Sequence, residues 1–181
     1  MECGGTSGGS TLLPRDTDCR INLFFMAASY PGPFKMSERE YPTRPICAVG
    51  VVCFKEENVL LVKRAKPPIT WEWSIPGGGQ ELGETTRDAA LRELKEETGI
   101  DARLIGLIDV IDTVRKDENE RIQFHYTLVD FAAEWVSGDP VADDDVSAAR
   151  WAPLCDIEKE GLWSETVRVI RDAERLRKSD G

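Results

Sequence analysis

The sequence has few of the features that mark membrane, secreted or nucleic-acid-binding proteins. None of its apolar runs is long enough to cross a bilayer. Its five cysteines are scattered, odd in number and without a CxxC pair, so neither a disulfide framework nor a zinc module is indicated. Acidic residues outnumber basic ones by 33 to 23, whereas a nucleic-acid duplex attracts a basic surface. These absences predict a cytoplasmic protein with reduced thiols that binds neither membranes nor duplexes.

The chain changes character near residue 40. Residues 1–40 are rich in glycine, serine and proline without a sustained hydrophobic period, which predicts a flexible leader. Met26 and Met36 are each candidate start residues, so the leader is open to a second explanation, an expression-derived or misannotated extension. Residues 41–181 are expected to form one globular domain with its own core.

Apolar periodicity predicts both strands and helices in residues 41–181, without a strict βαβ repeat. Strands are predicted at Ala48–Lys55, Val59–Val62, Trp73–Ile75, Ala102–Ile111, Ile122–Ala133 and Ala149–Trp151. A helix is predicted over Thr86–Thr98, with Thr85 or Thr86 as N-cap and Gly99 as its stop, and a second helix is predicted after Ser164. This mixture favours an α+β fold in which a mixed sheet lies between helices.

The stretch Gly78–Ile100 (GGQELGETTRDAALRELKEETGI) carries most of the functional information. On a helix that turns about 100° per residue, Glu97 falls roughly 40° to one side of Glu93 and Glu96 roughly 60° to the other, so three carboxylates share a face. Like charges this close destabilise a helix unless a hard divalent cation binds their oxygens. Mg²⁺ is the natural candidate, with Mn²⁺ as a substitute. In isolation, the same spacing would also fit a solvated acidic face.

Gly78, Glu84 and the run Arg92–Ile100 occupy every fixed position of the signature of the Nudix hydrolases, and the chain resembles that family over about residues 45–173. The resemblance implies a Nudix-type α/β/α sandwich with a mixed central sheet. It also implies a pyrophosphohydrolase in which divalent metals bridge the substrate pyrophosphate and the glutamates. The metal ligands implied are Glu93, Glu96, Glu97 and a loop carbonyl, assigned here to Gly78.

Arg92 and Glu84 are predicted to act together. The resemblance implies that their bidentate ion pair fixes the glycine loop against the helix and orients the acidic ligands, so both are candidate catalytic residues. Alternatively, Glu84 is only a favourable charge at the helix N-terminus. On the helical projection, Ala89 and Ala90 are expected to lie on the acidic face and to leave room beside the metals.

The sequence offers several candidates for the general base. Glu93 is one candidate, because a signature glutamate serves in some members of the family. In other members an acid on a later loop serves, and the candidates of that kind are Glu118, Glu120, Asp143, Asp144 and Asp145. Asp144 or Asp145 is favoured, because the corresponding loop in related hydrolases can reach the substrate. The alternative for each is a solvated acidic turn.

Three residues near the signature are candidates for substrate binding. Gly79 allows the main chain to approach a ligand closely. Trp73 has the ring to stack on a base, although packing in the core is the commoner role of such a residue. Arg64 has the donors to bind a phosphate or a terminal ribose, and a surface salt bridge is the equal alternative.

The flanks of the signature point to a substrate class. WSIPGGGQELGE before the helix, with HYTLVDF and DDDVSAARW after it, resembles the bacterial ADP-ribose pyrophosphatase-like branch. The resemblance implies cleavage of a small nucleoside diphosphate derivative, foremost ADP-ribose to AMP and ribose 5-phosphate. Alternatives are a hydrolase of oxidised nucleoside triphosphates that sanitises the nucleotide pool, and a non-catalytic nucleotide-sensing module. A homodimer is compatible with the resemblance, because relatives are often dimers.

Overall fold

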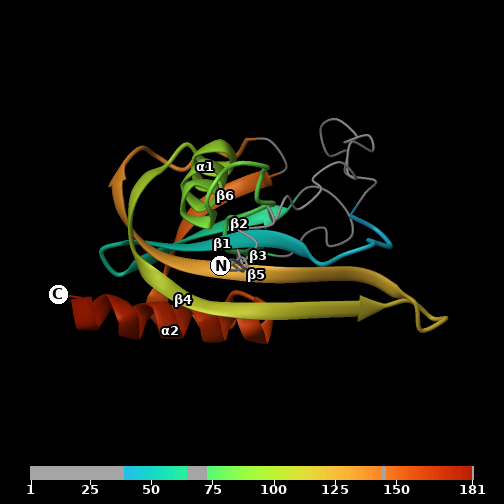
Figure 1. Cartoon of the computed structure of the whole chain (residues 1–181). Coiled ribbons are helices and arrows are strands. Elements are labelled where there is room, and N and C mark those ends of the chain that lie inside the picture. Colours follow the sequence, from blue (N-terminus) through green and yellow to red (C-terminus); the bar gives the residue numbers. More distant parts are fainter. Residues whose placement is uncertain (1–38, 65–72, 144–145, 181) are drawn as a thin grey trace, which may run out of the picture. The chain divides into compact units, whose positions relative to one another are not determined.

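The computed structural model describes residues 39–64, 73–143 and 146–180. In this part of the chain a six-stranded sheet carries helix α1 on one face and helix α2 on the other (Figure 1). The elements are β1 (Ile46–Lys55), β2 (Asn58–Arg64), β3 (Trp73–Ser74), α1 (Thr86–Thr98), β4 (Asp101–Lys116), β5 (Ile122–Ser137), β6 (Val146–Pro153), the 3₁₀-helix η2 (Leu154–Lys159) and α2 (Ser164–Asp180). Neither described helix has the length and apolar character needed to cross a membrane.

The sheet is mixed, as predicted. Its strands follow the order β3-β2-β1-β5-β4, and β6 pairs with the other side of β2. β1 and β5 run parallel from Ile46 opposite Tyr126 to Phe54 opposite Glu134, whereas the other pairs of strands are antiparallel. The predicted α+β sandwich is therefore confirmed.

Strand β1 lies at the centre of the sheet and supplies side chains to two cores. Val49, Val51 and Cys53 pack on the side of α1, whereas Val52 and Phe54 pack on the side of α2. Successive side chains of a strand point to opposite faces, so a strand covered by helices on both faces is a nearly continuous apolar run. The sequence of β1, ICAVGVVCFK, has that character.

The glycine-rich loop after β3 completes the sheet where β1 and β2 separate. β1 and β2 pair only beside their turn, and further along β1 the loop takes the place of β2. Val49 donates its backbone N–H to the carbonyl of Gly78 (2.8 Å), and Val51 donates to that of Pro76 (2.9 Å). A β-carbon at Gly77, whose φ is +155°, would overlap the carbonyl oxygen of Val49. Glycine is therefore required for the loop to lie this close to β1.

Helix α1 begins and ends as predicted. Thr85 is the N-cap and its hydroxyl accepts from the backbone N–H of Asp88 (3.2 Å), while Gly99 ends the helix with φ of 71°. The expected place of Ala89 and Ala90 was wrong. Both are fully buried in the core on this face of the sheet, because small side chains let the helix pack closely on the strands.

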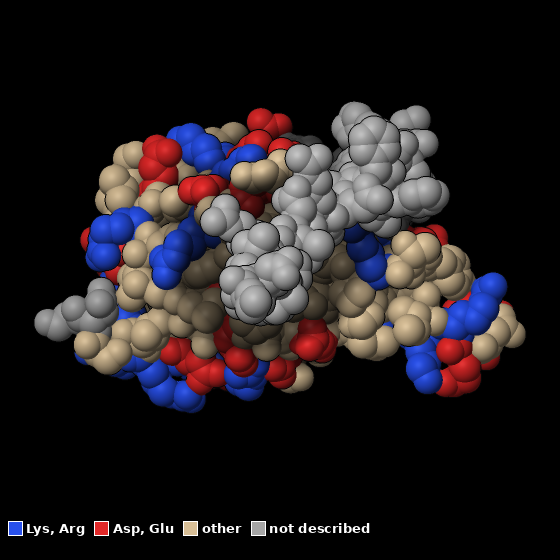
Figure 2. Space-filling view, viewed as in Figure 1, with Lys and Arg blue, Asp and Glu red and all other residues tan. Residues whose placement is uncertain are grey.

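Strands β4 and β5 are longer than predicted, and they extend to Lys116 and Ser137. Basic and acidic side chains lie side by side at the tip of the hairpin that they form (Figure 2). Residues 112–116, which follow the strand predicted to end at Ile111, therefore still belong to β4. Cross-strand contacts explain the difference, as where Thr127 donates its hydroxyl to the carboxylate of Asp112 (2.8 Å). Pairing with a neighbouring strand stabilises polar residues that have little strand preference of their own.

A buried carboxyl group lies in the middle of the sheet on the side of α2. Asp130 of β5 is 5% exposed, and its carboxylate occupies the space that a side chain at Gly50 of β1 would need. Burial, and then the charge of Asp109, raise the pKa of Asp130 to about 6, although Arg168 of α2 opposes the shift. Arg168 itself binds Asp109 (2.8 Å).

We expect Asp130→Asn to stabilise the protein at neutral pH. Because the pKa of Asp130 is raised in the folded state, its contribution to stability is greatest below the unfolded pKa and is lost as the pH rises toward about 6. The amide has no charge to bury and so removes a penalty of roughly 1–3 kcal/mol. Urea unfolding at pH 4, 5, 6 and 7 measures this, with Asp112→Asn as the exposed control. If the free energy of unfolding changed between pH 4 and 6 as steeply in Asp130→Asn as in the wild type, the raised pKa of Asp130 would be contradicted.

Candidate active site

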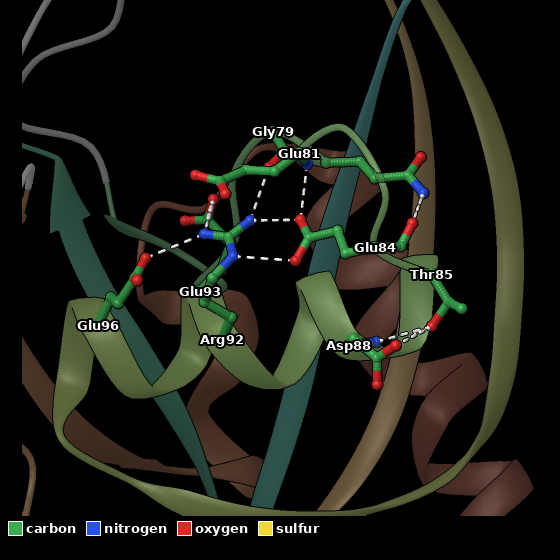
Figure 3. A network of polar contacts seen from close by, with 9 residues as sticks. Gly79, Glu81, Glu84, Thr85, Asp88, Arg92, Glu93 and Glu96 are labelled. Carbon is green, nitrogen blue, oxygen red and sulfur yellow. Dashed lines mark hydrogen bonds and ion pairs between the residues drawn. The ribbon is translucent and has the colours of Figure 1, made fainter. Parts of the chain in front are cut away.

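The guanidinium of Arg92 is the centre of the polar contacts on α1 (Figure 3). Its Nε and Nη2 donate to the two carboxylate oxygens of Glu84 (3.1 and 2.7 Å). Nη2 also donates to the carbonyl of Gly79 (3.0 Å), and Nη1 donates to both Glu93 (3.0 Å) and Glu96 (2.9 Å). These five contacts match the five N–H donors of a guanidinium, so the side chain has a partner in every direction.

Glu84 joins this centre to the loop. One of its carboxylate oxygens accepts from the backbone N–H of Glu81 (2.6 Å), and its backbone carbonyl accepts from the side-chain amide of Gln80 (2.7 Å). The hydrogen bond from Arg92, foremost, holds the pKa of Glu84 below its usual range. The ion pair predicted between Glu84 and Arg92 is thus formed, with 2.7 Å between Oε1 of Glu84 and Nη2 of Arg92. It links the loop to the helix.

Glu93, the residue after Arg92, faces the same loop. Its carboxylate fills the position that a β-carbon at Gly78 would occupy, and the side chain is 14% exposed. Burial raises the pKa of Glu93, whereas the contact with Arg92 and the charge of Arg39 lower it. A partly buried carboxylate with more than one cationic neighbour therefore lies directly on the glycine loop.

The other two signature glutamates differ in exposure. Glu97 is 4% exposed, and one of its oxygens accepts from the backbone N–H of Gly77 (2.9 Å). Glu96 lies on the outer side of Arg92, with 51% of its side chain exposed. The exposure of the three acids predicted to share one face therefore increases from Glu97 through Glu93 to Glu96.

These residues fit a divalent cation. Glu93 and Glu96 each place an oxygen about 3 Å from one nitrogen of Arg92, so a single small positive group already bridges them. The donors are all oxygens, the type that Mg²⁺ prefers. Among the described residues, no three acidic, histidine or cysteine side chains converge as a closed cage. An ion that takes one or two carboxylates and keeps other ligands suits this arrangement best.

The structure brings some of the predicted site residues to this cluster and not others. The carbonyl of Gly78 accepts from Val49, and each carbonyl oxygen has a second lone pair. Trp73 packs instead on the side of α2, with Arg150 over its ring at 4.4 Å, so it lies in the other core. Arg64 ends β2, and its side chain lies outside the described residues, as do Asp144 and Asp145.

One residue near the cluster was not predicted from the sequence. Arg39 lies in the segment before β1, with its Nη2 3.5 Å from where a β-carbon at Gly79 would stand. Its position falls within the stretch predicted to be a flexible leader, and no spacing or periodicity there points to a site. Only the folded chain brings it beside the loop.

Fold and cluster together define a class of enzyme, the hydrolases that cleave phosphoric anhydrides, in which a glycine loop and an acidic helix form the site. Residues 44–173 match the family model of the NUDIX domain, and the chain belongs to that family.

Relatives within the family differ in their activities. The ADP-ribose pyrophosphatase of Methanocaldococcus jannaschii is 30% identical over 128 residues, which cover 71% of this chain and 72% of the relative. The 8-oxo-dGTP diphosphatase of Proteus vulgaris is 42% identical over 90 residues, which cover 49% of this chain and 75% of the relative. The chain is therefore similar to members that act on two kinds of nucleotide.

Solved structures agree on the fold. The MutT NUDIX hydrolase from Burkholderia pseudomallei is 26% identical and superposes with a TM-score of 0.62, covering 71% of this chain and 98% of that one. The NUDIX domain of Shewanella oneidensis NrtR, solved with ADP ribose, has a TM-score of 0.63 at 23% identity, covering 84% of this chain and 96% of that one. At that identity the second likeness shows the fold alone.

We expect Arg92→Lys to weaken both the loop and the activity. Lysine keeps the charge, but its single ammonium cannot replace five donors in a planar fork. Thermal or urea unfolding should show a loss of roughly 2–3 kcal/mol, with a larger proportional fall in hydrolysis rate. Arg87→Lys, an exposed change on the same helix, is the control. Equal stability and activity of the two variants would contradict the central role of Arg92.

Proposed function

We propose that this chain is a Mg²⁺-dependent pyrophosphohydrolase whose main substrate is ADP-ribose, cleaved to AMP and ribose 5-phosphate. The observation that carries the proposal is the cluster of Glu93 and Glu96 on Arg92, with Glu97 on the backbone N–H of Gly77 and the glycine loop held against the helix. A pyrophosphate needs its negative charge neutralised and a water activated for attack. Carboxylates beside a close-lying backbone suit both needs when they hold a divalent ion.

Each residue has a proposed role. Glu93, Glu96 and Glu97 would hold the metal with a loop carbonyl, for which Gly78 is the candidate. Gly79 would let the substrate approach the main chain. When bound, the ion neutralises charge on phosphoryl oxygens and acidifies water. Arg92 and Glu84 keep the glutamates and the loop in register. For the general base, Asp144 or Asp145 stays the favoured prediction, and both lie outside the described residues. Among the other candidates, Glu93 is the one that lies in this cluster.

Substrate choice rests on the relatives. Similarity to the ADP-ribose pyrophosphatase extends over 128 residues, 71% of the chain, and therefore well beyond the signature. Similarity to the 8-oxo-dGTP diphosphatase is higher, yet it spans only 49% of the chain. ADP-ribose is therefore the first candidate. Hydrolysis of oxidised nucleoside triphosphates is the second, because the higher identity favours it.

A direct comparison of substrates tests the proposal. With Mg²⁺, purified protein should release AMP from ADP-ribose at least tenfold faster than it releases pyrophosphate from 8-oxo-dGTP. The reverse ratio would transfer the assignment to the pool-sanitising activity. Omission of the divalent ion, or its chelation, should abolish turnover of either substrate.

Glu97→Gln should lower turnover on the order of a thousandfold, because the amide oxygen is a poorer metal ligand than a carboxylate oxygen. The neutral side chain can still accept from Gly77, so the melting temperature should change little. Glu57→Gln, an exposed change in the turn between β1 and β2, is the control. Full turnover of Glu97→Gln would remove Glu97 from the site.

A sensing module without catalysis stays as the alternative of another class. Such modules usually lose a signature glutamate, and this chain keeps all of them. Tight binding of ADP-ribose by the wild type, with no product formed from any nucleoside diphosphate derivative in the presence of Mg²⁺ or Mn²⁺, would favour it. The homodimer, the cytoplasmic location and the domain boundary at residue 41 stay predictions.

A further inference from the structure

Arg39 brings a second guanidinium to the glycine loop. Among the described residues, its Nη2 is the group that a β-carbon at Gly79 would meet, at 3.5 Å, and the carbonyl of that glycine binds Arg92. The side chain is half-buried and comes from outside the signature, from the segment that precedes β1. Two arginines from distant parts of the sequence thus lie on one residue of the loop.

Contacts of the next two residues hold this segment in place. The carboxylate of Glu40 accepts from the side-chain amide of Gln123 (2.8 Å), and the backbone N–H of Tyr41 donates to the carbonyl of the same glutamine (2.8 Å). The ring of Tyr41 lies under the guanidinium of Arg121 at 4.8 Å. Arg39 is therefore anchored by the hairpin of β4 and β5 and extends from there to the loop.

The two guanidinium groups differ in how many of their N–H donors are available to a ligand. Arg92 has an acceptor for each of its five N–H donors. Within the described parts of the chain, no hydrogen bond or ion pair engages the guanidinium of Arg39. A ligand at the loop therefore finds donors on Arg39 without breaking the contacts that hold the helix.

The charges around the loop call for such a group. Glu84, Glu93, Glu96 and Glu97 face it from α1 and its approach, and Arg92 is the cation bonded among them. A pyrophosphate that entered would add further negative charge close to these acids. A guanidinium matches phosphate oxygens in a fork of two parallel hydrogen bonds, which makes arginine well suited to this place.

We propose that Arg39 is a phosphate-binding residue, whose guanidinium binds the non-bridging oxygens of a nucleoside diphosphate substrate over the glycine loop. The inference rests on the proposed function and adds to it a residue outside the signature. It also gives residues 39–45 a task in the site, although these described residues before β1 belong to no strand or helix.

Steady-state kinetics with ADP-ribose and Mg²⁺ test the proposal first. Arg39→Gln should raise KM about tenfold or more, since it removes a charge-assisted hydrogen bond to the substrate. Arg39→Lys, which keeps the charge but loses the fork, should lie between the wild type and Arg39→Gln. Arg44→Gln, an exposed change in the same segment, should stay within about twofold of the wild type. An unchanged KM in Arg39→Gln would overturn the proposal.

Binding without turnover separates a phosphate contact from a structural one. In calorimetric titrations without metal, Arg39→Gln should bind AMP about tenfold more weakly than the wild type does, with adenosine bound equally by both. Equal weakening for AMP and adenosine, or no weakening, would mean that Arg39 only supports the fold or neutralises Glu93. Melting temperatures show whether Arg39→Gln is folded, and Arg39→Lys serves for both titrations if it is not.

Failure of the substrate assignment would look different. If the wild type cleaved another nucleoside diphosphate derivative and not ADP-ribose, only the choice of substrate would fall. The KM effect of Arg39→Gln should then appear with that other substrate, because the pyrophosphate is common to both. If the wild type cleaved none, the proposed function would fall, and the titrations with AMP and adenosine would still decide whether Arg39 binds phosphate.

Discussion

The bidentate contact between Arg92 and Glu84 is the interaction on which the site depends. A loop of glycines has high conformational freedom and no side chains with which to pack, so something else must hold it. The guanidinium does so because it is flat, permanently charged and able to donate in five directions at once. One side chain therefore sets the position of a loop carbonyl, of Glu84 and of two further glutamates relative to one another.

The second support of the loop is the sheet itself. Because β1 and β2 pair only near their turn, β1 has free backbone groups further along, and the loop after β3 satisfies them. The loop thus pairs with β1 like a short additional strand on one side, and it contacts side chains of α1 on the other. Buried backbone groups need partners, so the divergence of two strands creates the place that the glycine loop fills.

Much of this arrangement was predictable from the residues. Thr85 and Gly99 gave the bounds of α1, and the apolar run of β1 predicted a strand, which the structure shows to be covered on both faces. What sequence could not supply was contact between distant segments. Ala89 and Ala90 fit an acidic face on a helical projection, but the projection does not say which side the sheet covers, and they lie in the core. No spacing or periodicity around Arg39 points to a site. Its position depends on the contacts that the next two residues make with Gln123 of β5.

The parallel pairing of β1 with β5 bears on how the site forms. A parallel pair needs a long crossover, and here that crossover contains the loop, α1 and β4, which means that the signature lies inside a closure between residues far apart in sequence. Contacts of this kind form late and slowly during folding, because the entropy of closing the chain is lost before they stabilise it. The segment with the most recognisable sequence is therefore one of the least able to adopt its structure alone. We therefore expect its glutamates to meet the loop only when β1 pairs with β5.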